Sequence, residues 1–197
     1  KPEQALRVEL DVKSPFIDAD DFILPESGKT DDQNTNENPF NLKDNISADL
    51  KLNVKEVVFR KFKARNLQGQ LEIKNKRLLA NNLSFEACGG DITFTGIADA
   101  SKDDKLKITG NVKLVDADIR QLFTQLNNFG QTAIEAQNMK GKATTQLDFS
   151  ASWNDHLQCD LSSIIASADV TITNGELVDY KVLEHLAEYV ELKELKQ

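Results

Sequence analysis

The chain has 197 residues with a formal net charge of −8, and 40% of its residues are hydrophobic while 28% are charged. This composition is typical of a globular protein with a core, and the acidic balance argues against a nucleic-acid partner, because such binding depends on neutralising phosphates. No apolar run approaches the roughly 18–20 residues that cross a bilayer as a helix, and Lys1–Gln4 opens directly into strand-like sequence rather than a signal peptide. We therefore expect a mature form or an excised piece of a longer protein.

Alternating apolar and polar residues predict strands in the first part of the chain, since strand side chains point to opposite faces with a period of two. The first such strand is Ala5–Lys13, and Phe16–Leu24 follows as a short irregular turn. The polar stretch 25–39 is predicted to be a mobile loop, because it has almost no apolar surface to bury. Alternation resumes over Ile46–Phe59, with a phase change near Lys55-Glu56 that predicts a bulge or a bend.

The stretch Leu67–Ala98 predicts three consecutive antiparallel strands that share one apolar face. Two turns separate them, one at Asn75–Arg77 and one at Gly89-Gly90, where glycine readily takes the positive φ that tight turns need. The residues predicted on the apolar face are Leu67, Gly69, Leu71, Ile73, Leu83, Phe85, Ala87, Ile92, Phe94 and Gly96.

The clearest alternation is Lys105–Asp116, after which the period changes to that of a helix. Apolar residues then stand at i, i+3, i+4 and i+7, which predicts an amphipathic helix over Asp118–Phe129. Asp116 or Asp118 is the candidate N-cap, and Gly130 is the expected end. The apolar stripe of this helix consists of Ile119, Leu122, Phe123 and Leu126.

The C-terminal part is predicted to hold two more strands and a second helix. Gly141 opens a strand that runs to Ala151, and Leu161–Ala168 fits either a short helix or an extended segment. Asp169–Leu177 reads as a strand interrupted at Asn174-Gly175, and Tyr180–Leu195 as an amphipathic helix. The predicted fold is thus mainly β (α+β): a long, curved antiparallel sheet with an apolar face, partly covered by two amphipathic helices.

Chemistry-bearing motifs are scarce in this sequence. There is no hydrolase elbow, phosphate-binding loop, dinucleotide fingerprint or zinc-protease helix, so we expect no enzyme, no cofactor and no metal. Cys88 and Cys159 permit one disulfide without requiring it. A cluster of basic residues forms either a solvated strand face, which we favour, or a contact with anionic lipid; it consists of Lys51, Lys55, Arg60, Lys61, Lys63 and Arg65.

Several motifs beyond Ile46 resemble the C-terminal region of the AsmA-like protein family. ARNLQGQLEIKNKRLLANNLSFEACGG is similar to that family's strand pair leading to a glycine pair, and Gly90–Gly96 resembles its following Gly-x-hydrophobic strand. VKLVDADIRQLFTQL looks like its strand and helix, and MKGKATTQLDFSAS like its next core strand. ADVTITNGELVDYKVLEHLAEYV resembles its terminal strand and helix, whereas the loop at 25–39 has no counterpart.

The resemblance implies a non-enzymatic module, residues 1–197 as a single β-rich domain, of a larger envelope protein of Gram-negative bacteria related to TamB and bridge-like lipid-transfer proteins. Such a protein would be periplasmic and held in the inner membrane by an anchor outside this chain. Its implied role is outer-membrane biogenesis, with phospholipid or another acyl-chain ligand bound or conducted along an apolar groove. Neighbouring domains of the full-length protein and other envelope proteins are the implied protein partners.

The apolar face of the sheet is the candidate lipid site, because acyl chains need burial rather than hydrogen bonds. Two alternatives stay open: an open apolar groove, or an ordinary core closed by the two helices. A structural or interaction module that assists outer-membrane protein assembly without binding lipid is the alternative function. The candidate groove residues are Leu71, Ile73, Leu83, Phe85, Ile92, Phe94, Ile108, Val112, Leu147 and Phe149.

Overall fold

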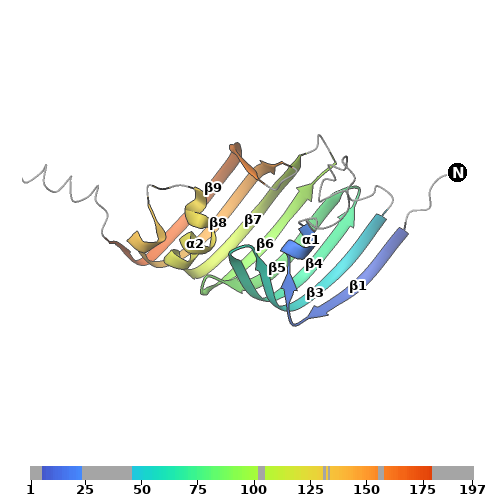
Figure 1. The fold of residues 1–197 in the computed structure, drawn as a ribbon, viewed down its shortest axis with the longest axis horizontal. Helices are drawn as coiled ribbons and strands as arrows, with labels where there is room; N and C mark the ends of the chain where they lie inside the picture. Colours follow the sequence, from blue (N-terminus) through green and yellow to red (C-terminus); the bar gives the residue numbers. More distant parts are fainter. Residues whose placement is uncertain are drawn as a thin grey trace, which may run out of the picture.

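The computed structural model describes residues 6–23, 46–101, 105–130, 132, 134–154 and 158–178. These residues form one nine-stranded sheet with a few short helices (Figure 1). The predicted loop at 25–39 and the predicted helix Tyr180–Leu195 lie outside the described residues. The strands are β1 (Leu6–Ser14), β2 (Ile17–Asp18), β3 (Ile46–Phe59), β4 (Phe62–Lys74), β5 (Arg77–Ala87), β6 (Gly90–Asp99), β7 (Leu106–Asp118), β8 (Met139–Trp153) and β9 (Cys159–Leu177). The helices are α1 (Asp20–Ile23), α2 (Ile119–Gln125) and the 3₁₀ segments η1 (Asn127–Gly130) and η2 (Ala136–Asn138).

The sheet is largely, but not wholly, antiparallel. Its strand order is β1-β3-β4-β5-β6-β7-β8-β9, and every neighbour from β3 onward is antiparallel. β1 and β2 instead pair with β3 in parallel, which corrects the prediction of an antiparallel sheet throughout. A parallel pair needs a long connection between its strands, and residues 15–45 separate β1 from β3 in the sequence.

The strand registers place the apolar side chains on one face of the sheet. Directly paired residues of neighbouring strands project to the same side, so each chain of paired residues forms a row across the sheet. The first row is Phe85–Ile92–Leu114, and the second is Leu83–Phe94–Val112–Leu147. The third row is Leu71–Ala80–Gly96–Gly110–Phe149, and the fourth is Ile73–Leu78–Ala98–Ile108–Ala151. We call the face that carries these four rows the apolar face.

Three strands keep this face apolar only because each contains a residue in the left-handed backbone region. These residues are Asn66 in β4, Asn82 in β5 and Asp116 in β7, with φ values of 52°, 47° and 56°. At each one the pairing register shifts, so the strand gains one residue and its apolar positions change from even to odd numbers. Asn and Asp tolerate this conformation better than other residues that carry a Cβ atom, which explains their presence here.

These shifts account for several differences from the predicted strands. β5 begins at Arg77, whereas the alternation in the sequence predicts a start near Asn82. The register shift at Asn82 changes the phase of the alternation, so the sequence does not reveal that Leu78 and Ala80 belong to the same apolar face. In β3, Lys55 has no partner in the ladder, although the residues on either side of it pair with β4 in a constant register. The irregularity near Lys55 therefore lies opposite Asn66, whose φ is positive.

Local boundaries differ elsewhere too. The β5–β6 turn is formed by Cys88 and Gly89, both with positive φ, while Gly90 already belongs to β6. The stretch predicted as an irregular turn contains β2 and α1. The ambiguous segment Leu161–Ala168 is extended and belongs to β9, which continues past a shift in register near Asn174.

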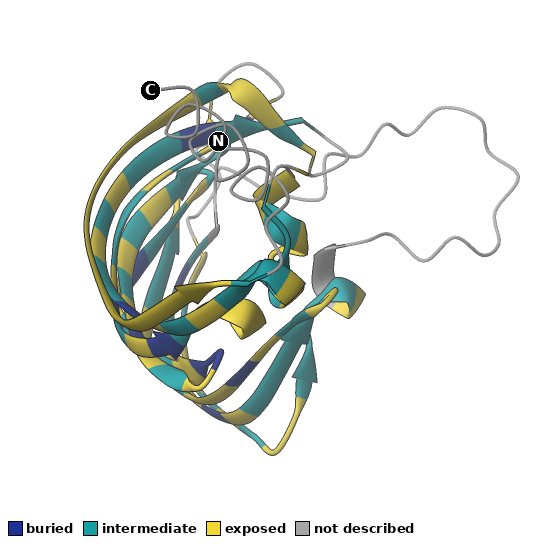
Figure 2. Ribbon diagram, turned by 90° about the vertical axis from the view of Figure 1, so that its left-hand side faces the viewer, coloured by how far each residue is buried: buried dark blue, intermediate teal, exposed yellow. Residues whose placement is uncertain are grey.

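The sheet is curved, and α2 lies on its concave side (Figure 2). The buried cluster joins Ile119 of α2 to Ile92, Leu114 and Ala143 of the apolar face, with Phe123 packed against it. The apolar face is therefore the concave one. The Asp118 carboxylate caps α2 by accepting a hydrogen bond of 2.8 Å from the Gln121 amide, as the sequence predicts.

The helix itself is shorter than predicted, since it ends at Gln125 rather than Phe129. Asn127, Asn128 and Phe129 have φ values of 52°, 51° and 54°, which are incompatible with a continuing right-handed helix. Gly130 follows with a φ of 73°. The apolar residues keep helical spacing as far as Leu126, so this spacing does not reveal the change to positive φ that begins at Asn127.

Asp116 offers a test of the register shift in β7. Its side chain is exposed and its φ is 56°, so Asp116→Val should lower the free energy of unfolding by about 1–2 kcal/mol. Asp116→Gly should change it by less than about 0.5 kcal/mol, because relief of backbone strain offsets the added chain flexibility. Denaturant unfolding of both variants measures this difference, and equal losses in the two would contradict the assigned conformation.

Candidate functional site

All ten candidate groove residues project to the apolar face, and the four rows bring them together. Three of them lie in or against the cluster that α2 covers: Ile92 is buried, and Phe85 and Val112 pack on it. The remaining seven lie outside that cluster and are half-buried; they are Leu71, Ile73, Leu83, Phe94, Ile108, Leu147 and Phe149. Within the described part of the chain, α2 thus covers the first row and leaves most of the other three rows uncovered.

Phe94 fills the centre of the uncovered region. Its ring lies over two glycines of the third row, because a Cβ atom built on Gly96 or Gly110 would come within 2.6 Å or 2.5 Å of it. The ring also stacks on Phe149, with centroids 6.5 Å apart and planes 28° apart. The absence of side chains at Gly96 and Gly110 therefore makes room for an aromatic floor on the apolar face.

A second close fit shapes the neighbouring strands. Leu83 lies over Gly69, where an added Cβ atom would meet the Leu83 Cδ2 atom at 2.7 Å and the Asn82 carbonyl oxygen at 2.9 Å. Gly69 also has a φ of 142°, which side-chain-bearing residues rarely adopt. Together with the register shift at Asn82, this packing brings β4 and β5 close under the Leu83 side chain.

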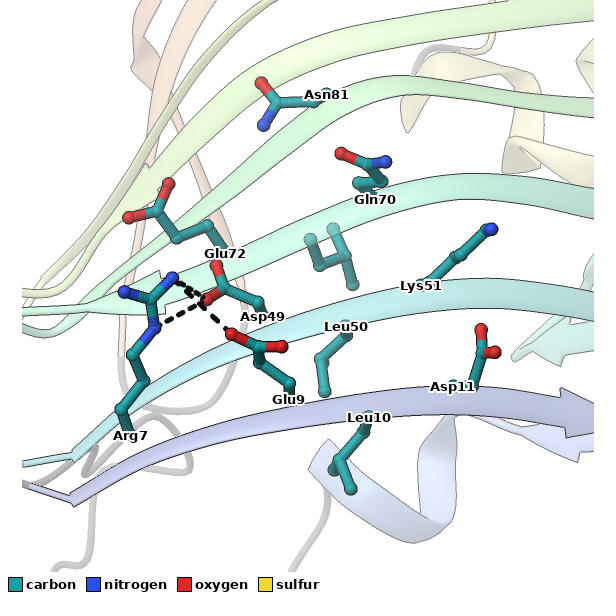
Figure 3. A pocket seen from close by; sticks show the side chains of 11 residues that line it. Arg7, Glu9, Leu10, Asp11, Asp49, Leu50, Lys51, Gln70, Glu72 and Asn81 are labelled. Atoms are coloured by element: carbon teal, nitrogen blue, oxygen red, sulfur yellow. Dashed lines mark hydrogen bonds and ion pairs between the residues drawn. The ribbon is translucent and has the colours of Figure 1, made fainter.

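The opposite face of the sheet is polar and carries mixed charges. An open depression of about 560 Å³ lies on it over β1, β3, β4 and β5 (Figure 3). Arg7 donates to one carboxylate oxygen of Asp49 from Nε and Nη2, at 3.1 and 2.8 Å, and this hydrogen bond raises the pKa of Arg7. Exposed ion pairs of this kind contribute little to stability, and the surrounding charges have both signs. We interpret this surface as a solvated face.

The basic cluster predicted from the sequence is exposed on β3, β4 and the turn between them. Arg65 pairs in the ladder with Glu56 on one side and Glu86 on the other, so its charge is balanced. This arrangement agrees with a solvated strand face. Lys61 in the turn donates a hydrogen bond to Asn127 just after α2, and the amide of Lys63 at the start of β4 donates one to Gln125 at the end of α2.

The two cysteines are both free thiols and lie at opposite ends of the strands. Cys88 is buried in the β5–β6 turn, and its carbonyl oxygen accepts a hydrogen bond of 2.8 Å from the Asp118 amide. Burial raises the pKa of the Cys88 thiol to about 11, and the Asp118 carboxylate adds to the rise. Cys159 begins β9 and is partly exposed; burial and then Asp160 raise its pKa as well.

Two kinds of site are missing from the described residues. No group of three or more His, Cys, Asp or Glu side chains there could hold a metal ion, while His156 and His185 lie outside this part of the chain. In the same residues, no helix has the length and apolar character needed to cross a membrane.

Comparison of the chain with protein-family models, curated proteins and solved structures finds no match. The likeness to AsmA-like proteins stays a prediction from the sequence motifs.

Sequence reasoning missed two parts of this site. None of the candidate groove residues comes from β1 or β9, yet Leu10 pairs with Leu50, and Val170 and Ile172 pair with Thr145 and Ala143. It also missed the role of Asn66, Asn82 and Asp116. The available signal was a change in the phase of the apolar alternation next to an Asn or Asp.

The alkylation rates of the two thiols test how tightly the β5–β6 turn is packed and how far α2 covers it. With a pKa of about 11, only about 0.1% of Cys88 is thiolate at pH 8, so its alkylation by iodoacetamide should be slower than that of the more exposed Cys159. The Cys88 rate should rise as the pH increases toward 11, because the reactive thiolate becomes populated. Peptide mass spectrometry measures both rates, and denaturant should equalise them. A faster Cys88 in the folded protein would show that the turn is not packed as described.

Proposed function

We propose that this chain is a non-enzymatic module of an AsmA-like envelope protein that binds or conducts phospholipid along the apolar face of its sheet. In this proposal it acts in the periplasm as part of a protein anchored in the inner membrane, and it contributes to outer-membrane biogenesis. Neighbouring domains of the same protein would continue the lipid path.

One observation carries the proposal: a concave, continuous apolar face of which most candidate side chains lie outside the cluster that α2 covers. The second, third and fourth rows hold seven half-buried candidate side chains outside the α2 cluster. An ordinary two-layer fold covers such a face with helices or a second sheet. Helix α2 packs on this face through the buried cluster, and the candidate side chains outside that cluster are half-buried, which supports an apolar ligand as their complement.

The dimensions also suit an acyl chain. The third row crosses five strands, which at about 4.8 Å between neighbours spans roughly 19 Å. One leaflet of a bilayer core is about 15 Å thick, so a single row can accompany most of a lipid tail. Each CH₂ group that leaves water is stabilised by about 0.8 kcal/mol, and no hydrogen bond is required of the protein.

A protein-interaction module is the second candidate function, and the edges of the sheet favour it. β1 and β9 each have one neighbour in the described sheet, so their outer edges are unpaired within it. β9 also exposes large apolar side chains on both faces, such as Ile165 at 76% and Val170 at 58%. An added strand from a partner could use such an edge.

The lipid proposal is tested by placing a charge on either face of the same strand. Phe94→Asp puts a carboxylate in the second row, whereas the control Thr93→Asp puts the same charge one residue away on the polar face, opposite Lys113. After incubation with vesicles of phosphatidylethanolamine and phosphatidylglycerol, native mass spectrometry counts the phospholipid carried by the separated protein. We expect wild type and Thr93→Asp to carry lipid and Phe94→Asp to lose at least tenfold.

Phe94→Asp also removes the ring that covers two glycines, which disturbs the packing of the sheet. Leu71→Asp therefore repeats the test at the far end of the third row. Circular dichroism confirms that the variants compared are folded. Wild-type protein that carries no phospholipid after exposure to vesicles would overturn the lipid proposal and leave the interaction module.

A further inference from the structure

β9 forms one outer edge of the sheet and pairs with β8 on its inner side (Figure 1). Between two shifts in register, Ile165–Thr173 pair with Lys142–Ser150 of β8 in a constant register, and every one of these β9 residues is exposed. The backbone N–H and C=O groups of alternate residues point away from β8, so this stretch presents hydrogen-bonding groups that are unpaired within the described sheet. We call Ile165–Thr173 the edge segment.

The two outer strands of the sheet differ in their protection against pairing with another strand. Charged side chains on an outer strand, lysine above all, discourage such pairing. β1 carries a charged residue at every second position; these are Arg7, Glu9, Asp11 and Lys13. The edge segment of β9 has one charged residue, Asp169, no lysine or proline, and a β-branched run at Val170–Thr173, which favours strand pairing. An added strand is therefore opposed at β1 and not at the edge segment.

The concave side of the edge segment indicates what kind of strand would complete it. Val170 is 58% exposed and Ile172 is 51% exposed, although both project to the apolar face beside Thr145 and Ala143 of β8. A strand added outside β9 covers them best when its own concave positions are apolar. The edge segment of a second copy meets this requirement, because its concave positions hold Ala166, Ala168, Val170 and Ile172.

Symmetry limits how two copies of this strand can pair. Two identical antiparallel strands of one sheet are related by a twofold axis perpendicular to the sheet, and directly opposite residues project to the same face. The axis must therefore pass through a residue, because each concave residue then faces another concave residue. The backbone groups that point outward meet each other in the same arrangement.

Charge and packing select Val170 as the residue on the axis. An axis through Asp169 would set two carboxylates directly opposite each other, which destabilises a strand pair. With the axis at Val170, Asp169 faces Thr171 of the second copy, whose hydroxyl can donate a hydrogen bond to the carboxylate. The small Ala168 then faces the larger Ile172, and the two Val170 side chains face each other.

An irregular stretch of β9 favours the same register. Residues 161–164 lie between two paired positions that the single residue Ala151 separates in β8, so they interrupt the regular pairing. An axis at Ala168 would bring this irregular stretch against the edge segment of the second copy. An axis at Val170 places it beyond that segment, so that Ser167–Thr173 of the two copies pair without interruption.

We propose that this protein forms a symmetric dimer in which the edge segments of two copies pair antiparallel about Val170. The two sheets then become one, and their concave apolar faces are continuous across the axis. Backbone hydrogen bonds supply the affinity, and the side chains on both faces fix the register. One strand pair is a small interface, so we expect a reversible dimer. The dimer goes beyond the proposed function, since it requires no lipid.

Sedimentation velocity over a series of micromolar concentrations tests the dimer. Wild-type protein should pass from monomer to dimer as its concentration rises. Val170→Lys sets two like charges against each other at the axis and should weaken the dimer at least about tenfold. The matched control Leu10→Lys places the same charge on the concave side of β1, where Leu10 is 50% exposed, and should dimerise like wild type. Wild-type protein that stays monomeric, or equal weakening in the two variants, would overturn the proposal.

Cysteine pairing tests the register, in a Cys159→Ser background that removes the partly exposed native thiol. Val170→Cys should form a disulfide between two copies on oxidation with diamide, because directly opposite residues have Cα atoms about 4.5–5.5 Å apart. Ala168→Cys should not, because its two copies are displaced by four residues, or about 13 Å, along the strands. A disulfide that forms as fast at Ala168→Cys as at Val170→Cys would overturn the assigned register.

The dimer and lipid carriage fail separately in these assays. Val170→Lys should be monomeric and still carry phospholipid in native mass spectrometry. Phe94→Asp should lose carried phospholipid and still dimerise. A wild-type monomer that carries phospholipid would overturn the dimer alone, whereas a wild-type dimer without phospholipid would overturn lipid carriage alone.

Discussion

The structure depends on keeping the apolar side chains of successive strands on one face of a long sheet. A strand alternates its faces with a period of two, so one inserted residue would turn every later side chain to the wrong side. Asn66, Asn82 and Asp116 insert such a residue, and in each strand the apolar positions change phase at the same point. The local backbone and the apolar pattern therefore compensate for each other. The register shifts add bend and twist to the strands while the concave face stays apolar.

That concave face has two regions that differ in packing. Around α2 it forms a conventional core, with Ile92, Leu114 and Ile119 buried and Cys88 held at a raised pKa beside Asp118. Beyond α2 the large candidate side chains are half-buried, Ala80 and Ala151 of the third and fourth rows are buried, and Phe94 covers the space above Gly96 and Gly110. In the proposed function the packed region near α2 holds the shape of the sheet and the rest of the face meets the ligand. On this account folding and binding use the same apolar pattern, and the extent of helical cover separates them.

Much of the sheet could be predicted from the sequence because alternation is a local signal. The strands around Leu71, Phe94 and Val112 and the apolar face they share are confirmed, and so is Asp118 as the cap of α2. The parallel pairing of β1 could not be predicted, since it depends on where the chain returns after residue 45. The early end of α2 depends on the left-handed backbone at Asn127 and Phe129, which leaves no mark on apolar periodicity. The start of β5 was hidden by the phase change at Asn82.

The central claim is that the concave face meets lipid and the convex face does not. Site-specific photocrosslinking tests this most directly, with a benzophenone amino acid placed at Phe149 or at Ser150. These neighbours in β8 project to opposite faces, since Phe149 pairs with Gly110 in the third row and Ser150 pairs with Thr109. After illumination with phospholipid vesicles, the account predicts a protein–phospholipid adduct from position 149 and little or none from position 150. Equal crosslinking at both positions, or none at position 149, would contradict it.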